Sequence, residues 1–93
     1  MVYSLQRAVV GDYEEWKAIV EELADRRAES GSQGGQLFKS PANPNEIVVL
    51  FEWESEEKAR EFMEEVIPAK QWDRARIHSY EIHFLEHVED LDA

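Results

Sequence analysis

An uninterrupted apolar run, IVVLF at residues 47–51, constrains the fold of this chain more than any other feature. Successive side chains of a β-strand point to opposite faces of its sheet, so this run predicts a strand that is covered on both faces. Its flanking residues extend the predicted strand to residues 46–53. One layer of helices covers only one face of a sheet, so the second face needs another cover.

The N-terminal third of the chain predicts a strand followed by a helix. Residues 2–10 alternate between an apolar face and a mixed face, which is the pattern of a strand. Asp12 and Glu15 have the spacing of a capping box, so a helix is expected to begin directly after Asp12. The apolar stripe that follows repeats at helical spacing, and Gly31 is expected to end this single helix.

Further elements are expected on either side of the apolar run. Residues 36–40 predict a short strand before it. After it, Ser55 is expected to cap a second amphipathic helix, which Pro68 ends. A short helix or turn is expected around Trp72. Residues 79–88 alternate again and predict the final strand.

The element order β-α-β-β-α-β predicts one α+β domain of the ferredoxin-like class, spanning residues 1–93 with an ordered core of about 2–88. Both helices bury one stripe, so they share one face of a four-stranded antiparallel sheet. The other face carries an apolar set such as Val48, Leu50 and Leu85, and an exposed apolar face of this size marks an interface. We therefore expect a homodimer in which two open sheet faces meet.

The acidic composition and the lack of cysteine exclude several functions. Asp and Glu number 21 against 10 Lys and Arg, and the resulting net charge of −11 repels nucleic acids and anionic membranes. Without cysteine, the chain has no disulfide, thiolate nucleophile or cysteine-bound metal. No apolar run approaches the roughly 20 residues of a membrane span, and the first residues lack the features of a signal peptide. A cytoplasmic protein is expected.

Three short motifs are similar to those of a known family. They are DYEEW at residues 12–16, NPNE at residues 43–46 and FEWES at residues 51–55. Together with the element order, they make residues 2–88 resemble the antibiotic biosynthesis monooxygenase-like domains of the dimeric α+β barrel superfamily. The resemblance implies a homodimer with a pocket between the sheet and the helices of each subunit. It also implies oxygenation of a small aromatic or polyketide-like molecule without metal or flavin.

The chain departs from the family pattern at two places. The oxygenases and the haem-degrading members typically carry an asparagine on the first strand, where this chain has Ser4 and Gln6. The haem-degrading members place a ligating histidine in the second helical region, whereas His78 follows that region. Two functions therefore stay open. One is a cofactor-independent monooxygenase, and the other is a non-catalytic homodimeric module that binds a ligand or has a structural role.

Aromatic and ionisable residues in the C-terminal half are the candidate site. Oxygenation without a cofactor takes its electrons from the substrate, so the protein must hold a flat aromatic, exclude water and help to remove a proton. Trp53, which matches a pocket residue of the family, and Trp72 are the candidate aromatic walls, and the alternative is that these aromatic side chains only pack in the core. His78 and His83 are candidate bases because imidazole titrates near neutral pH. Tyr80 is a candidate donor to an oxyanion.

Glu52 is a further candidate, as a ligand-binding residue or general base, because it lies within the most apolar strand and a buried carboxylate needs a partner. The alternative is a strand-end residue that reaches water or pairs with Arg7. His83 and His87 share a face of one strand but lie about 13 Å apart, so no metal site is expected from them. The glycine-rich residues 31–35 precede a strand, so they predict a helix cap and bend instead of a phosphate loop.

Overall fold

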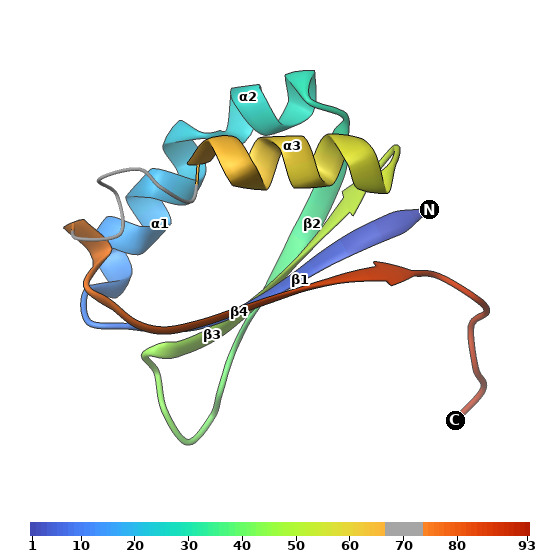
Figure 1. The fold of residues 1–93 in the computed structure, drawn as a ribbon. Helices are drawn as coiled ribbons and strands as arrows, with labels where there is room; N and C mark the ends of the chain where they lie inside the picture. The colour runs from blue at the N-terminus through green and yellow to red at the C-terminus, as the bar shows by residue number, and fades with distance from the viewer. Residues whose placement is uncertain (67–73) are drawn as a thin grey trace.

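The chain folds into an antiparallel sheet that carries its helices on one face (Figure 1). The computed structural model describes residues 1–66 and 74–93. Within them the elements are β1 (Val2–Val10), α1 (Tyr13–Glu22), α2 (Ala24–Glu29), β2 (Ser32–Lys39), β3 (Glu46–Trp53), α3 (Glu56–Val66) and β4 (Ile77–Glu86). The strand order is β2-β3-β1-β4, with every pair antiparallel, so β1 and β3 are central. The predicted ferredoxin-like α+β fold is confirmed.

The sequence signals that begin the helices act as predicted. Asp12 caps α1, because its Oδ1 accepts a hydrogen bond from the backbone N–H of Glu15 at 3.1 Å. Ser55 caps α3 in the same way, and its Oγ accepts from the backbone N–H of Lys58 at 3.2 Å. None of the helices in the described ranges has both the length and the apolar character that a membrane span requires.

The first helix is divided, whereas the sequence predicts one helix that continues to Gly31. α1 ends just before Leu23, and α2 begins just after it. The guanidinium of Arg27 donates a hydrogen bond to the backbone carbonyl of Val20 at 2.8 Å. A continuous helix pairs that carbonyl with the backbone N–H of residue 24, so the side-chain bond favours a break at Leu23. Gly31 follows α2 with a φ of +98°, the left-handed conformation expected of a helix end.

The glycine-rich residues after Gly31 belong to a strand, which therefore begins four residues earlier than the predicted residues 36–40. β2 begins at Ser32, and its register shifts between Ser32 and Gly34. A Cβ atom on Gly35 would lie 2.3 Å from the backbone oxygen of Leu50, so only glycine lets β2 pair with β3 at this position. β4 begins and ends two residues earlier than predicted. The helix or turn predicted around Trp72 lies outside the described residues.

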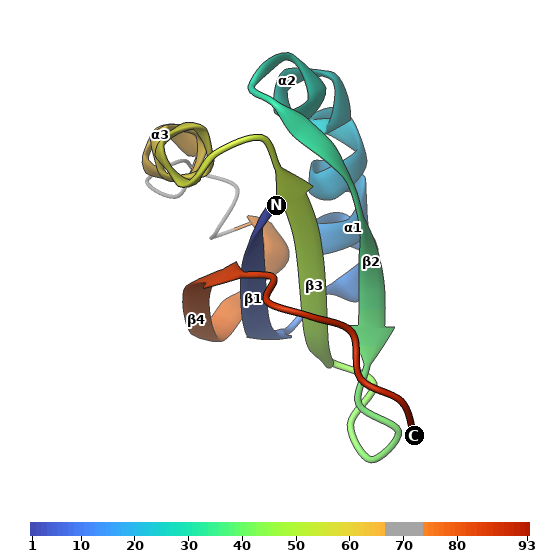
Figure 2. The same cartoon turned by 90° about the vertical axis from the view of Figure 1, so that its right-hand side faces the viewer.

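The two faces of the sheet differ in what covers them (Figures 1 and 2). The face beneath the helices holds the core, in which Ile47 and Trp53 are at most 1% exposed. The opposite face carries the predicted apolar set of Val48, Leu50 and Leu85, and Leu85 is 43% exposed. In the part of the chain that the structure describes, no helix packs on this open face. The sequence predicted one open apolar face with this set or the alternative set, and the structure shows this set on the face without helices.

Candidate functional site

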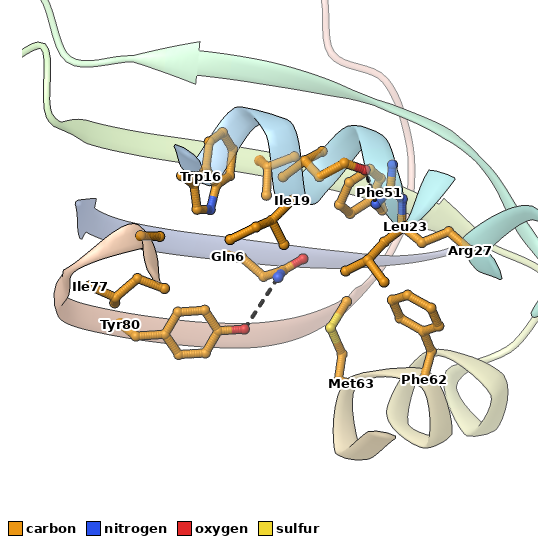
Figure 3. A pocket seen from close by; sticks show the side chains of 13 residues that line it. Gln6, Trp16, Ile19, Leu23, Arg27, Phe51, Phe62, Met63, Ile77 and Tyr80 are labelled. Carbon is orange, nitrogen blue, oxygen red and sulfur yellow. Dashed lines mark hydrogen bonds between the residues drawn. The ribbon is translucent and has the colours of Figure 1, made fainter. Parts of the chain in front are cut away.

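A partly open apolar cavity of about 90 Å³ lies between the helices and the sheet, and Figure 3 shows its lining side chains. Its lining side chains are Gln6, Trp16, Ile19, Val20, Leu23, Arg27, Val49, Phe51, Phe62, Met63, Ala75, Ile77 and Tyr80. An enclosed apolar cavity of roughly 150 Å³ holds one benzene ring. This cavity is smaller than that, so it encloses no more than one ring and only with part of that ring extending beyond it.

Local sequence patterns place the walls of the cavity. α1 presents Trp16 and its apolar neighbours toward the sheet at helical spacing. The alternation of β1 directs Gln6 to the helix-covered face, two residues from the fully buried Ser4. Ala75 is also fully buried, and the preceding Arg74 ties this segment to α1 through a hydrogen bond to Glu22 at 3.1 Å. The cavity is thus built from segments that are distant in sequence.

Gln6 and Tyr80 form a polar pair on the cavity wall. The Gln6 Nε2 donates a hydrogen bond to the Tyr80 hydroxyl at 3.2 Å. The Gln6 Oε1 is buried and has no hydrogen-bond partner in the described part of the chain. Figure 3 shows this oxygen directed away from Tyr80 and into the cavity. A buried acceptor without a partner is costly, so it offers a bond to a ligand that carries a donor.

The burial of Tyr80 affects its protonation. Burial raises the pKa of its phenol above the ordinary value, and the hydrogen bond from Gln6 opposes this rise. The phenol is therefore neutral near pH 7. A neutral phenol can donate a hydrogen bond, and such a donor stabilises negative charge that develops on a bound ring.

Arg27 brings a positive charge to the cavity wall. Its guanidinium lies 4.5 Å from the centroid of the Phe51 ring and donates to the Val20 carbonyl. Burial lowers the pKa of this guanidinium from its ordinary value, although arginine stays charged near pH 7. Among the ion pairs within residues 1–66 and 74–93, none includes Arg27. The cavity thus has a partly buried cation without a carboxylate partner.

The structure brings one of the predicted site residues into the cavity, namely Tyr80. Trp53 lies in the core and does not line the cavity, and its indole Nε1 donates to the Ser4 Oγ at 2.9 Å. His78 is exposed and lies beside the turn between β1 and α1. Trp72 falls outside the described residues. The ligand-binding role of Trp53 and the catalytic role of His78 remain predictions.

Glu52 and His83 lie on the open face of the sheet, opposite the cavity. The sheet itself separates them from a ligand in the cavity. The sequence offered the alternative that Glu52 pairs with Arg7. In the structure Arg7 instead forms ion pairs with Glu46 at 3.3 Å and Glu81 at 3.6 Å. A role for Glu52 or His83 would therefore belong to the open face.

Sequence reasoning missed Gln6 and Arg27 as cavity residues, although each carried a signal. Gln6 occupies an inward position of an alternating strand, where a polar side chain is unusual. Arg27 follows Trp16 and Leu23 at helical spacing, so a charged residue continues an apolar stripe. The signal from Arg27 was obscured because arginine near a helix end normally faces solvent.

Comparisons with known proteins were made for the sequence and for the fold. A family model described as antibiotic biosynthesis monooxygenase matches residues 7–66. The fold resembles SnoaB, a cofactor-independent oxygenase from Streptomyces nogalater, with a TM-score of 0.77 and 16% identity over 99% of this chain and 97% of that one. A candidate antibiotic biosynthesis monooxygenase from Bordetella bronchiseptica has a TM-score of 0.73 and 15% identity, covering 95% of this chain and 97% of that one. No curated protein matches the sequence.

Proposed function

The chain belongs to the antibiotic biosynthesis monooxygenase family, and on this premise we propose that it oxygenates a small aromatic molecule in the cavity without metal or flavin. The observation that carries the proposal is the apolar cavity between sheet and helices, whose aromatic walls hold the polar pair of Gln6 and Tyr80. An apolar cavity with a few converging polar groups is the usual form of a small-molecule site. The fold shared with SnoaB, a cofactor-independent oxygenase, is consistent with this reaction class.

The proposed reaction takes its electrons from the substrate. A ring methylene group activated by a carbonyl of the same ring loses a proton to give a carbanion, which is stabilised as an enolate. Dioxygen reacts at that carbon, one oxygen atom is retained as a carbonyl, and the other leaves as water. The balance is one CH2 group and one O2 molecule giving one C=O group and one H2O. The apolar walls support this step because they exclude water from the reactive anion.

Tyr80 has the proposed role of holding the substrate oxygen as its negative charge develops. Its raised pKa keeps the phenol protonated, so it acts as a donor and not as a base near pH 7. Among the described lining residues, none is a carboxylate or an imidazole. The substrate must therefore be acidic enough to ionise with little help. His78 and His83 remain predicted bases that the cavity does not require.

A homodimer is part of the proposal. The open face of the sheet carries Val48, Leu50 and Leu85 without a cover from the described part of the chain. A second copy presents the same face, and two such sheets pack across a two-fold axis. A chain of 93 residues without a disulfide also gains the burial that a small domain needs.

A second candidate function is a ligand-binding module that performs no chemistry. The observation that favours it is the absence of a carboxylate or imidazole from the lining, as far as the structure describes it. Such a module would bind the same class of aromatic molecule and release it unchanged.

The experiment that tests the proposal is oxygen uptake with a panel of quinols and anthrones, followed by mass spectrometry of products formed under ¹⁸O2. We expect one ¹⁸O atom in the product and a large loss of turnover in Tyr80→Phe. The matched control is Tyr13→Phe, because Tyr13 begins α1 and does not line the cavity. Binding without turnover would support the non-catalytic module. If no member of the panel binds, the cavity is not a ligand site and both functions are refuted.

A further inference from the structure

Arg27 is the one cation among the described residues that line the cavity. Several cations of the described ranges form ion pairs with carboxylates, namely Arg7, Lys17, Arg26, Lys58, Arg60 and Arg74. Arg27 has a backbone carbonyl and an aromatic ring as neighbours and takes part in no ion pair of those ranges. Lys39 and Arg76 also form no ion pair within these ranges, and Lys39 lies over the Tyr13 ring, but neither of them lines the cavity.

The position of Arg27 gives this observation a functional meaning. Its side chain is part of the cavity wall, beside the buried rings of Phe51 and Phe62. A partly desolvated cation without a counter-ion is energetically unfavourable, and an anion that enters the cavity relieves this cost. Guanidinium also offers a fork of donors that fits a carboxylate in a bidentate manner.

Gln6 supplies the second half of a recognition site. Its Oε1 is a buried acceptor without a partner in the described structure, while the Nε2 of the same amide donates to the Tyr80 hydroxyl. A ligand O–H or N–H therefore gains a bond that costs the protein no rearrangement.

We propose that the cavity selects a single-ring aromatic acid, whose ionised group pairs with Arg27 and whose hydroxyl donates to the Oε1 of Gln6. This inference rests on the proposed function, because it names the substrate class of the same cavity. The volume of about 90 Å³ limits the buried part to one ring. The net negative charge of the chain repels anions as a whole. A preference for an anionic ligand over its neutral analogue would therefore point to a local cation in the cavity.

Pairs of ligands that differ in one group test the proposal on the unaltered protein by isothermal titration calorimetry at pH 7. The first pair is 4-hydroxybenzoate and its neutral amide, 4-hydroxybenzamide. We expect the acid to bind about tenfold more tightly or better, because a hydrogen-bonded pair of charges is lost in the amide. The second pair is 4-hydroxybenzoate and 4-methoxybenzoate, which lacks the donor. We expect a loss of about threefold to tenfold for the methoxy compound.

Variants then assign each preference to a residue. Arg27→Gln is expected to abolish the preference for the acid over the amide, and the adjacent Arg26→Gln is the charge-matched control. Arg26 is exposed and paired with Glu65, away from the cavity lining. Gln6→Met is expected to abolish the preference for hydroxy over methoxy, with the exposed Gln33→Met as its control.

The outcomes separate this inference from the proposed function. If the acid and the amide bind equally well to the unaltered protein, the aromatic site stands and the selection by Arg27 is refuted. If the preferences exist but survive both Arg27→Gln and Gln6→Met, the assignment to these residues is refuted. If none of the compounds or the quinol panel binds, the cavity itself is refuted as a site. The comparison of the acid with the amide uses the unaltered protein, so it can be made even if a variant fails to fold.

Discussion

The buried pair of Ser4 and Trp53 allows a sharp test of whether Trp53 belongs to the core or to the ligand site. Both residues have 0% exposure, and the indole Nε1 donates to the Ser4 Oγ at 2.9 Å. Ser4→Ala removes the acceptor and leaves a buried N–H without a partner. A donor left in this way costs about 1–3 kcal/mol, and water cannot replace the lost bond at zero exposure. For a domain of this size, each 1 kcal/mol lowers Tm by roughly 4–8 °C.

Trp53→Phe completes a double-mutant cycle. The indole packs at 5.5 Å from Phe62 and 6.4 Å from Phe51, measured between ring centroids, so the smaller ring also loses contacts. In Trp53→Phe the indole N–H is absent, so Ser4→Ala no longer removes a hydrogen bond and costs less stability. We therefore expect the double variant to be about 1 kcal/mol less destabilised than the sum of the single variants.

Urea unfolding followed by far-UV circular dichroism measures these free energies, with all variants at one protomer concentration because a dimer is stabilised by mass action. Ser79→Ala is the control, since Ser79 is an exposed serine on β4. Binding of phenol to the folded Ser4→Ala protein is expected to be unchanged. If Ser4→Ala keeps its full stability but no longer binds phenol, the assignment of Trp53 to the core is refuted. Trp53 would then belong to the ligand site.

Two further predictions concern pH and assembly. Burial raises the pKa of Tyr80 above its ordinary 10.0, so above about pH 10 the unfolded chain loses this proton while the folded chain retains it. The contribution of protonated Tyr80 to the free energy of unfolding is therefore complete below pH 10. It is lost as the pH rises through the pKa that Tyr80 has in the folded protein. The free energy of unfolding, measured with urea, should therefore fall less steeply with pH above pH 10 in Tyr80→Phe than in the unaltered protein. An equal fall in both proteins would contradict this prediction. Light scattering should give twice 10.9 kDa for the chain and a lower mass for Leu85→Glu. A mass near 10.9 kDa for the unaltered chain at micromolar concentration would contradict the homodimer.

Patterns between near neighbours in sequence were the ones that could be predicted. The apolar run gave the bounds of β3, and the spacing of Asp12 and Glu15 gave the start of α1. Caps and periodicities depend on the next few residues, so they hold before any tertiary contact forms. The two predictions that were wrong depend on contacts made elsewhere. Arg27 bonds to the Val20 carbonyl at the break between α1 and α2, and Gly35 admits the Leu50 carbonyl that extends β2.

Most of the candidate site came only from the tertiary structure. Gln6 and Tyr80 are 74 positions apart, and the register of β1 with β4 brings them together. The alternation of β4 shows that Tyr80 and His83 point to opposite faces of the sheet. It does not show which of the two faces carries the helices, so the sequence could not place Tyr80 in the cavity. The sequence by itself determined the order of the strands and main helices and that one face of the sheet needs a cover from outside the helices. Only the packing of helices on one side decided which residues line the cavity, because burial depends on every neighbour at once.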